Sequence, residues 1–218
     1  MNRKELYPHH SSLITHHSSS GIGTTFEEDA RGRGYRLVAG LDEVGRGALA
    51  GPVVAAAVIL NNETPLPDGL NDSKKLSAAQ RERIAGELRE TVVAFAVGAV
   101  PAEEIDRTNI LIATRRAMVE ALAQLNPRAD FLLIDALQLK ECTLPQRAII
   151  RGDSVSASIA AASVIAKTFR DALMRDYDAQ FPNYGFPSHV GYGTHAHLAA
   201  LRAHGPCPIH RRSFRGVL

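Results

Sequence analysis

The sequence predicts an α/β domain in which helices flank a mixed central sheet. Short apolar runs rich in β-branched residues alternate with longer segments whose apolar residues recur at helical spacing. Glycine and proline separate these segments, for example at Asn126-Pro127. With 218 residues, 45% of them hydrophobic, the chain is long enough to bury one core. We therefore expect a single domain of alternating strands and helices.

The first half of this domain is predicted to contain three strands and two helices. The strand-like runs are apolar and lie at Leu37–Leu41, Pro52–Leu60 and Thr91–Val100. A helix should begin at Ser77, because Gln80 three residues later completes a capping-box pattern, and it should end near Glu90. Pro101 begins one long helical pattern that Asn126-Pro127 stops.

The second half is predicted to contain two short strands and two further helices. The strand candidates are Phe131–Ile134 and Ala148–Ile150. A helix of small residues should cover about Ser156–Tyr177, and its alanines would allow close packing on the sheet. Proline, glycine and aromatic residues then give an irregular segment, followed by a last helix around Thr194–His204.

Composition excludes several classes of protein. Cys142 and Cys207 lie far apart and lack metal-ligand spacing, so we expect no disulfide framework and a cytoplasmic protein. We also expect a monomer. The longest uncharged apolar run, Val53–Leu60, is too short to span a bilayer. The net charge is only +2, but no acid follows Asp178 while arginines and histidines continue to the end. That basic tail indicates contact with a polyanion or, equally, a solvated basic face.

Residues 1–25 differ from the rest of the chain. They repeat a His-His-Ser-Ser unit, show no hydrophobic periodicity and contain no apolar core of a signal peptide. One interpretation is metal capture by the histidines. We favour a disordered, dispensable extension that is foreign to the native domain, so that residues 26–218 form the folded unit.

Four acids follow predicted strands. Asp42 and Glu43 are adjacent at the end of an apolar run, Asp135 ends the run at 131–134, and Asp153 follows the run at 148–150. Because ligands of open α/β sheets gather at the carboxyl ends of strands, these acids are expected to converge. Clustered carboxylates repel one another unless a cation is present, and Mg²⁺ and Mn²⁺ prefer carboxylate oxygens. The pattern therefore suits a two-metal site that hydrolyses phosphodiesters.

Asp153 and a further acid, Asp171, have competing interpretations. Asp153 precedes Ser154 and could simply cap a turn or a helix. Asp171 is a competitor for the fourth ligand position, but it lies mid-helix beside basic residues, so we assign it to a surface ion pair.

The turn Gly45-Arg46-Gly47 follows the acid pair directly. Its glycines let the backbone approach a ligand closely, and arginine is a frequent phosphate partner. From these residues alone the turn is a candidate phosphate site.

A series of motifs from about Phe26 to Phe214 resembles the signature of the type 2 ribonuclease H (ribonuclease HII) family. The first joins the acid pair and the glycine turn to Ala50-Gly51-Pro52-Val53. The others follow in order: Asn71-Asp72-Ser73-Lys74-Lys75-Leu76, Leu133-Ile134-Asp135, Gly152-Asp153, Ala161-Ala162-Ser163 with Ala166-Lys167, Gly191-Tyr192-Gly193-Thr194 and His210-Arg211-Arg212-Ser213-Phe214.

The resemblance implies a ribonuclease H-like fold with a C-terminal helical extension over about residues 180–218. It implies cleavage of RNA in RNA–DNA hybrids, and cleavage on the 5′ side of single ribonucleotides in duplex DNA, leaving 3′-hydroxyl and 5′-phosphate ends. By motif, Asp42, Glu43, Asp135 and Asp153 would bind two Mg²⁺ or Mn²⁺ ions, with Asp42 bridging both.

The resemblance also implies how the substrate is recognised. In the family, the backbone of the turn corresponding to Gly45, Arg46 and Gly47 reads the ribose 2′-hydroxyl, which both donates and accepts hydrogen bonds. The tyrosine corresponding to Tyr192 packs against the next nucleotide. Without the resemblance, Tyr192 would be interpreted as a loop-packing aromatic.

Several polar residues are candidates for contacts with backbone phosphates, which give affinity without sequence preference. They are Lys74, Lys75, Lys167, Ser163 and Thr194. Lys167 could equally be a solvated helical lysine.

The chain departs from the family pattern at two positions. Arg151 stands where lysine is frequent and keeps the charge, whereas Val190 replaces a frequent lysine and removes one phosphate contact. The rivals are a type 3 ribonuclease H acting mainly on long hybrids, a transposase-like enzyme and a non-enzymatic nucleic-acid-binding module. No clamp-binding motif is evident after Phe214, so clamp binding stays open.

Overall fold

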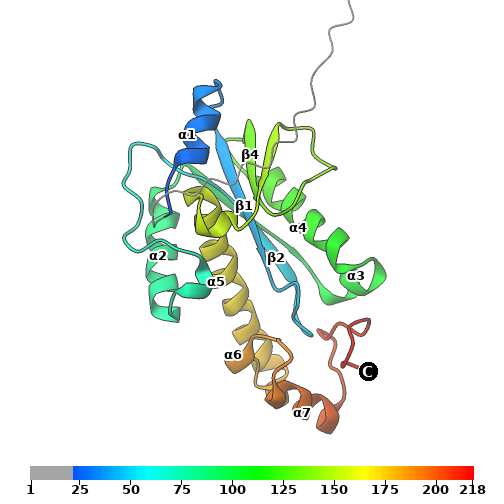
Figure 1. Cartoon of the computed structure of the whole chain (residues 1–218). Coiled ribbons are helices and arrows are strands. Elements are labelled where there is room, and N and C mark those ends of the chain that lie inside the picture. The colour runs from blue at the N-terminus through cyan, green and yellow to red at the C-terminus, as the bar shows by residue number, and fades with distance from the viewer. Residues whose placement is uncertain (1–21) are drawn as a thin grey trace, which may run out of the picture.

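The computed structural model describes residues 22–218 (Figure 1). The expectations for residues 1–21 therefore lie outside the described residues. The predicted boundary at residue 25 is a few residues late, because Ile22 packs on the core and Gly23 forms a β-bridge with Ser156. The fold thus includes residues 22–25. None of the helices in the described part is long and apolar enough to cross a membrane.

The centre of the molecule is a five-stranded mixed sheet with the order β3-β2-β1-β4-β5. β1 pairs antiparallel with β2, and β2 with β3, whereas β4 is parallel to both β1 and β5. The strands are β1 (Val38–Val44), β2 (Val53–Ile59), β3 (Ala94–Val100), β4 (Phe131–Asp135) and β5 (Gln146–Ile149). The predicted mixed sheet is confirmed.

Helices cover both faces of this sheet (Figure 1). The helices concerned are α2 (Ala78–Thr91), α3 (Ala102–Arg107), α4 (Ile110–Gln124) and α5 (Ala157–Gln180). Successive residues of β2 alternate between the two cores: Val54 packs with α2 and α5, and Val53 packs with α3 and α4. Because both faces are covered, β2 is apolar throughout and fully buried.

Small residues bring α5 very close to the sheet. A Cβ placed on Gly40 of β1 would lie 2.1 Å from the carbonyl carbon of Ser158 in α5. The alanines at 160–162 and 166 are all fully buried. The close approach expected from the small-residue helix is therefore confirmed, and it brings α5 against the strand that carries the acid pair.

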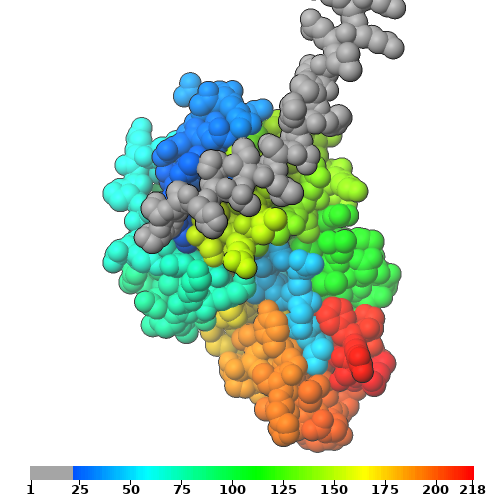
Figure 2. Space-filling model, viewed as in Figure 1, coloured from blue at the N-terminus to red at the C-terminus, as the bar shows by residue number. Residues whose placement is uncertain are grey.

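The C-terminal part forms a small lobe with its own core. It contains α6 (Phe186–His189) and α7 (His195–His204), and it packs around buried aromatic residues such as Phe186. Figure 2 shows the blue surface of the β1–β2 connection between this orange lobe and the red C-terminal segment. Backbone hydrogen bonds join them, since Leu49 N–H donates to Gly191 O and Arg211 N–H donates to Leu49 O, both at 2.8 Å.

Three details of the predicted elements were wrong. The long helix expected after Pro101 is divided into α3 and α4, because Asn109 leaves the helical backbone and its side chain caps α4 by accepting from Ile112 N–H. The first helix, α1 (Thr25–Gly32), was not predicted. β1 also extends past Leu41 to Val44, because its pairing with β2 continues through the acid pair.

Candidate active site

Strand topology brings the four acids together. β1 and β4 are parallel neighbours in register, with Leu41 opposite Ile134, so that Asp42 and Asp135 follow side by side at the same edge. Asp153 lies in the short 3-10 helix η2 (Gly152–Ser154), directly after β5 on the other side of β4. The Asp135 carboxylate accepts a hydrogen bond from Gly152 N–H at 2.7 Å, which ties η2 to the end of β4.

Burial and mutual repulsion disfavour the charged forms of Asp42 and Asp135. Desolvation, followed by the charges of Glu43 and Asp135, holds the pKa of Asp42 well above its ordinary value. Desolvation is also the main cause that raises the pKa of Asp135 to about 6, with Asp153 and Glu43 adding to it. The site therefore carries an excess of negative charge that a cation would relieve.

Two basic side chains already contact the acids. Lys74 Nζ lies 3.1 Å from Asp153 Oδ2, and Arg46 Nη1 lies 3.2 Å from Glu43 Oε1. Burial lowers the pKa of Lys74, but the hydrogen bond and charge of Asp153, followed by the charge of Asp72, outweigh it and raise the pKa overall. The Lys74 side chain is largely exposed and the Arg46 side chain is about half exposed.

The donor set fits a hard divalent cation. All four acids offer oxygen ligands, and Glu43 Oε2 is buried without a hydrogen-bond partner among residues 22–218. With the side chains as they stand, no three His, Cys, Asp or Glu side chains in that range are gathered around a common point. Lys74 takes one oxygen of Asp153, and Gly152 takes one of Asp135.

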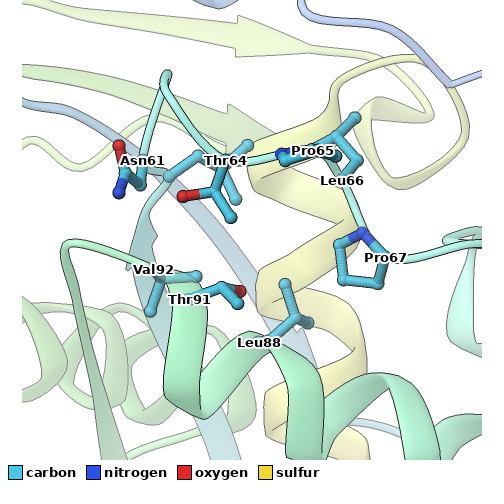
Figure 3. Close-up of a pocket in the computed structure, with 9 residues that line it drawn as sticks. Asn61, Thr64, Pro65, Leu66, Pro67, Leu88, Thr91 and Val92 are labelled. Carbon is cyan, nitrogen blue, oxygen red and sulfur yellow. The ribbon is translucent and has the colours of Figure 1, made fainter.

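A cleft of about 360 Å³ opens beside the acid pair. It brings together residues that the sequence singled out in separate motifs. Its lining consists of Asp42, Glu43, Val44, Ser73, Lys74, Ser163, Lys167 and Tyr192. A second hollow, under the connection after β2, has room for about 10 Å³ and contains no titratable side chain (Figure 3). The wider cleft is the one suited to catalysis.

The predicted phosphate contacts differ in their surroundings. Lys167 lines the cleft but pairs with Asp171 at 2.6 Å, so the ion pair assigned to Asp171 is confirmed, although both side chains are mostly buried. Lys75 is outside the lining, with Nζ 3.4 Å from Ser154 Oγ. Thr194 Oγ1 caps α7 by accepting from the N–H of residue 197 at 3.3 Å, a local role that the sequence analysis missed.

Tyr192 lines this cleft, and Gly47 of the Gly45-Arg46-Gly47 turn lies beside its ring. A Cβ placed on Gly47 would meet the Tyr192 ring edge at 4.0 Å. Gly45 has φ +90°, a conformation that L-residues rarely adopt. The Tyr192 side chain is 36% exposed, which leaves one side of its ring open for contact.

Ser73 was not assigned a role by the sequence analysis. Its hydroxyl lies 2.7 Å from the Ser163 hydroxyl, and it lines the cleft. Asp72 caps the short 3-10 helix η1 (Ser73–Lys75) by accepting from Lys74 N–H at 2.9 Å. The Asp-Ser-Lys order was the available signal, because an aspartate two residues before a lysine commonly caps a turn.

Comparisons with known proteins agree with this arrangement. The sequence model of the ribonuclease HII family matches residues 39–217. Ribonuclease HII of Chlamydia caviae is 55% identical, over 89% of this chain and 91% of that protein. Ribonuclease HII of Geobacter metallireducens is 54% identical, over 88% of this chain and 90% of that protein. The ribonuclease H2 structure from Pyrococcus horikoshii has a TM-score of 0.70 at 26% identity, over 84% of this chain and 95% of that chain.

The matched region contains all of the sheet except Val38, together with the four acids, the glycine turn and Tyr192. The similarity therefore covers the sheet that builds the site and the lobe that completes it. This chain belongs to the ribonuclease HII family, and it is a metal-dependent nuclease with a ribonuclease H-like fold.

Proposed function

We propose that this chain hydrolyses the RNA strand of RNA–DNA hybrids and also cuts on the 5′ side of single ribonucleotides embedded in duplex DNA. The products carry a 3′-hydroxyl and a 5′-phosphate. The observation that carries the proposal is one cleft lined by the acid pair of β1 and by Tyr192, whose ring lies beside Gly47 of the turn. The acids would hold the ions that hydrolyse the phosphodiester, and the turn and Tyr192 would recognise the ribonucleotide.

Asp42, Glu43, Asp135 and Asp153 would hold two divalent cations, Mg²⁺ or Mn²⁺. When bound, such ions activate water and stabilise the leaving oxygen. The protein contributes the positions of these oxygens at the ends of β1 and β4 and on η2 after β5. The raised pKa values of Asp42 and Asp135 reflect their burial and the repulsion among the acids, which bound cations would offset.

Selection of a ribonucleotide requires contact with its 2′-hydroxyl. The backbone groups of Gly45, Arg46 and Gly47 are suited to that contact, because the glycines leave them uncovered. The open side of Tyr192 would pack against the nucleotide 3′ to the ribonucleotide, so that the RNA-to-DNA junction is read as a unit. Its exposure and its position beside Gly47 support this role.

Phosphate contacts would hold the strand across the cleft. Lys74 and Ser163 line it and are placed to meet phosphates, as is Lys167 once its pairing with Asp171 loosens. Lys75 and Thr194 would contact the backbone further from the cut. The exposed arginines of the C-terminal lobe would bind the duplex beyond that. We propose that the protein acts as a monomer, which light scattering on the purified chain would check.

The type 3 alternative receives less support, because the matching family model and the similar proteins named above are all of type 2. A binding module without activity would leave the buried, repelling acids without a purpose. A transposase-like enzyme would have no need for the turn and Tyr192 together.

The test uses duplex DNA with one ribonucleotide and, separately, a long RNA–DNA hybrid, each with Mg²⁺ or Mn²⁺. We expect a single cut on the 5′ side of the ribonucleotide, and loss of at least about a hundredfold in rate for Asp135→Asn. Asp176→Asn, an exposed acid on α5, is the matched control and should keep full activity. Absence of cleavage by the intact protein, or full activity of Asp135→Asn, would refute the mechanism.

A second comparison tests the reading of the ribonucleotide. Tyr192→Ala should slow cleavage at the single ribonucleotide much more than cleavage of the long hybrid, whereas Tyr192→Phe, which keeps the ring, should retain most of the preference. Equal losses of Tyr192→Ala on both substrates would count against the role of the ring.

A further inference from the structure

Two arginines, Arg170 on α5 and Arg211 in the C-terminal segment, are fully buried. Neither forms an ion pair with a carboxylate within the described residues 22–218. Burying a charge without a counter-charge is costly, and two like charges close together cost more. Desolvation, with Arg170 as the next cause, lowers the pKa of Arg211 to about 9. A feature this unfavourable to stability needs a compensating role.

The Arg170 guanidinium joins two segments far apart in the sequence. Its Nε donates to Pro52 O at 3.0 Å and its Nη2 donates to Ala50 O at 3.0 Å, both in the connection after the glycine turn. Its Nη1 donates to Val190 O at 2.8 Å, two residues before Tyr192. One rigid fork therefore fixes the spacing between the two loops that reach the cleft.

Arg211 binds the glycine turn itself. Its Nη1 donates to Arg46 O at 2.9 Å and its Nε donates to Gly51 O at 3.0 Å. Its Nη2 is buried and has no hydrogen-bond partner among the described residues. The C-terminal segment thus holds the turn at Arg46 and the following connection at Gly51 through one side chain.

Arg170 also packs against Tyr192 and against the glycine turn. Its Cζ lies 5.6 Å from the centroid of the Tyr192 ring, a cation–π distance. A Cβ at position 45 would lie 2.3 Å from Arg170 Nε, so the turn can rest on the guanidinium only with glycine there. One face of the Tyr192 ring is therefore held by the protein, and its exposed part stays available to a nucleotide.

We propose that Arg170 and Arg211 are positioning residues that lock the Gly45-Arg46-Gly47 turn and Tyr192 into one rigid unit for ribonucleotide selection. Carbonyl groups rather than carboxylates hold the two guanidinium groups, so their bonds fix backbone positions. The ordering of both loops is thereby completed before the substrate arrives, which reduces the entropy lost on binding. The inference rests on the proposed function and adds the residues that make the selection rigid.

The experiment compares kcat/KM on the duplex with one ribonucleotide and on the long hybrid. Arg170→Lys keeps the charge but cannot reach three carbonyl oxygens at once. We expect it to lower the ratio of the two kcat/KM values by about tenfold, which is the scale of one cation–π contact. Arg175→Lys, an exposed residue on the same helix, is the matched control and should leave the ratio unchanged.

A double-mutant cycle separates positioning from general support of the fold. In a Tyr192→Ala background, Arg170→Lys should cause a smaller fall in the ratio than in the wild type, because the part of its effect that acts through the tyrosine is already lost. Equal losses on the two substrates, or the same fall in ratio with and without Tyr192, would overturn the inference.

A second variant keeps the test decisive if Arg170→Lys does not fold. Arg211→Lys should also lower the ratio, because it releases the turn at Arg46 O. An unchanged ratio for folded Arg211→Lys would overturn the inference while the proposed function stands. An intact protein that cleaves neither substrate would overturn the proposed function and this inference with it.

Discussion

Replacing Asp135 with asparagine should stabilise the metal-free protein while it abolishes cleavage. The Asp135 carboxyl is held among other acids at the end of β4, and its pKa is raised from 3.8 to about 6, mainly by burial. Asparagine keeps the oxygen that accepts from Gly152 N–H and removes the charge. The substitution therefore deletes an unfavourable charge without deleting the hydrogen bond.

The size of the effect follows from the raised pKa. The rise from 3.8 to about 6 corresponds to roughly 3 kcal/mol for a fully buried group, and partial exposure of this side chain reduces it to about 1–3 kcal/mol. Because the folded form binds the proton more tightly, wild-type stability falls as pH rises through about 6. The advantage of Asp135→Asn should be complete above about pH 7 and should vanish toward pH 4.

Urea unfolding in EDTA at pH 8, 6 and 4.5 measures this difference, with Asp176→Asn as the exposed control. Adding Mg²⁺ should raise the midpoint of the wild type more than that of Asp135→Asn, since the folded wild type binds the ion better. If Asp135→Asn is no more stable than the wild type at pH 8 in EDTA, the electrostatic reasoning fails.

Three further predictions concern the lobe and the cleft. The pKa of His210 is lowered to about 4 by burial and then by the charge of His197. The free energy of unfolding should therefore fall by up to about 3 kcal/mol between pH 6.5 and 4. In His210→Gln, the free energy measured by urea unfolding should change less with pH over this range. Gly45→Ala should lose about 1–3 kcal/mol because it combines φ +90° with a 2.3 Å clash, whereas thermal unfolding of Gly86→Ala, in open space on α2, should show a small gain. Lys74→Ala should raise KM and reduce the slope of log KM against log salt concentration by about one, the value for one lost phosphate contact. An unchanged slope would show that Lys74 does not contact a phosphate.

Several elements were determined by residues close together in the sequence. The capping box predicted at Ser77 is present, with Gln80 N–H and the Ser77 hydroxyl paired. The alternation of apolar runs predicted the five strands, and the strand-end rule placed Asp42 and Asp135 at one edge. These inferences succeeded because backbone preference and hydrophobic period depend on neighbours along the chain.

Other features depended on packing that no local pattern encodes. The apolar pattern is helical on both sides of Asn109, but the Asn109 side chain caps α4 and so separates it from α3. α1 is short and mostly polar, and it is held by contacts of Glu27 with Ser156 and Ser158, far along the chain. The pairing of Lys74 with Asp153 likewise joins residues from different motifs.

The sequence by itself determined the fold class, the acids and the turn, because these follow from composition, periodicity and motif order. Only the tertiary structure decided that Tyr192 lies beside Gly47 and that two buried arginines, neither paired with a carboxylate within residues 22–218, hold the turn and the segment before Tyr192. In a sequence, Arg170 and Arg211 look like ordinary solvated arginines. Their burial is set by the closing of the C-terminal lobe over the β1–β2 connection, and such long-range contacts depend on the whole packed core.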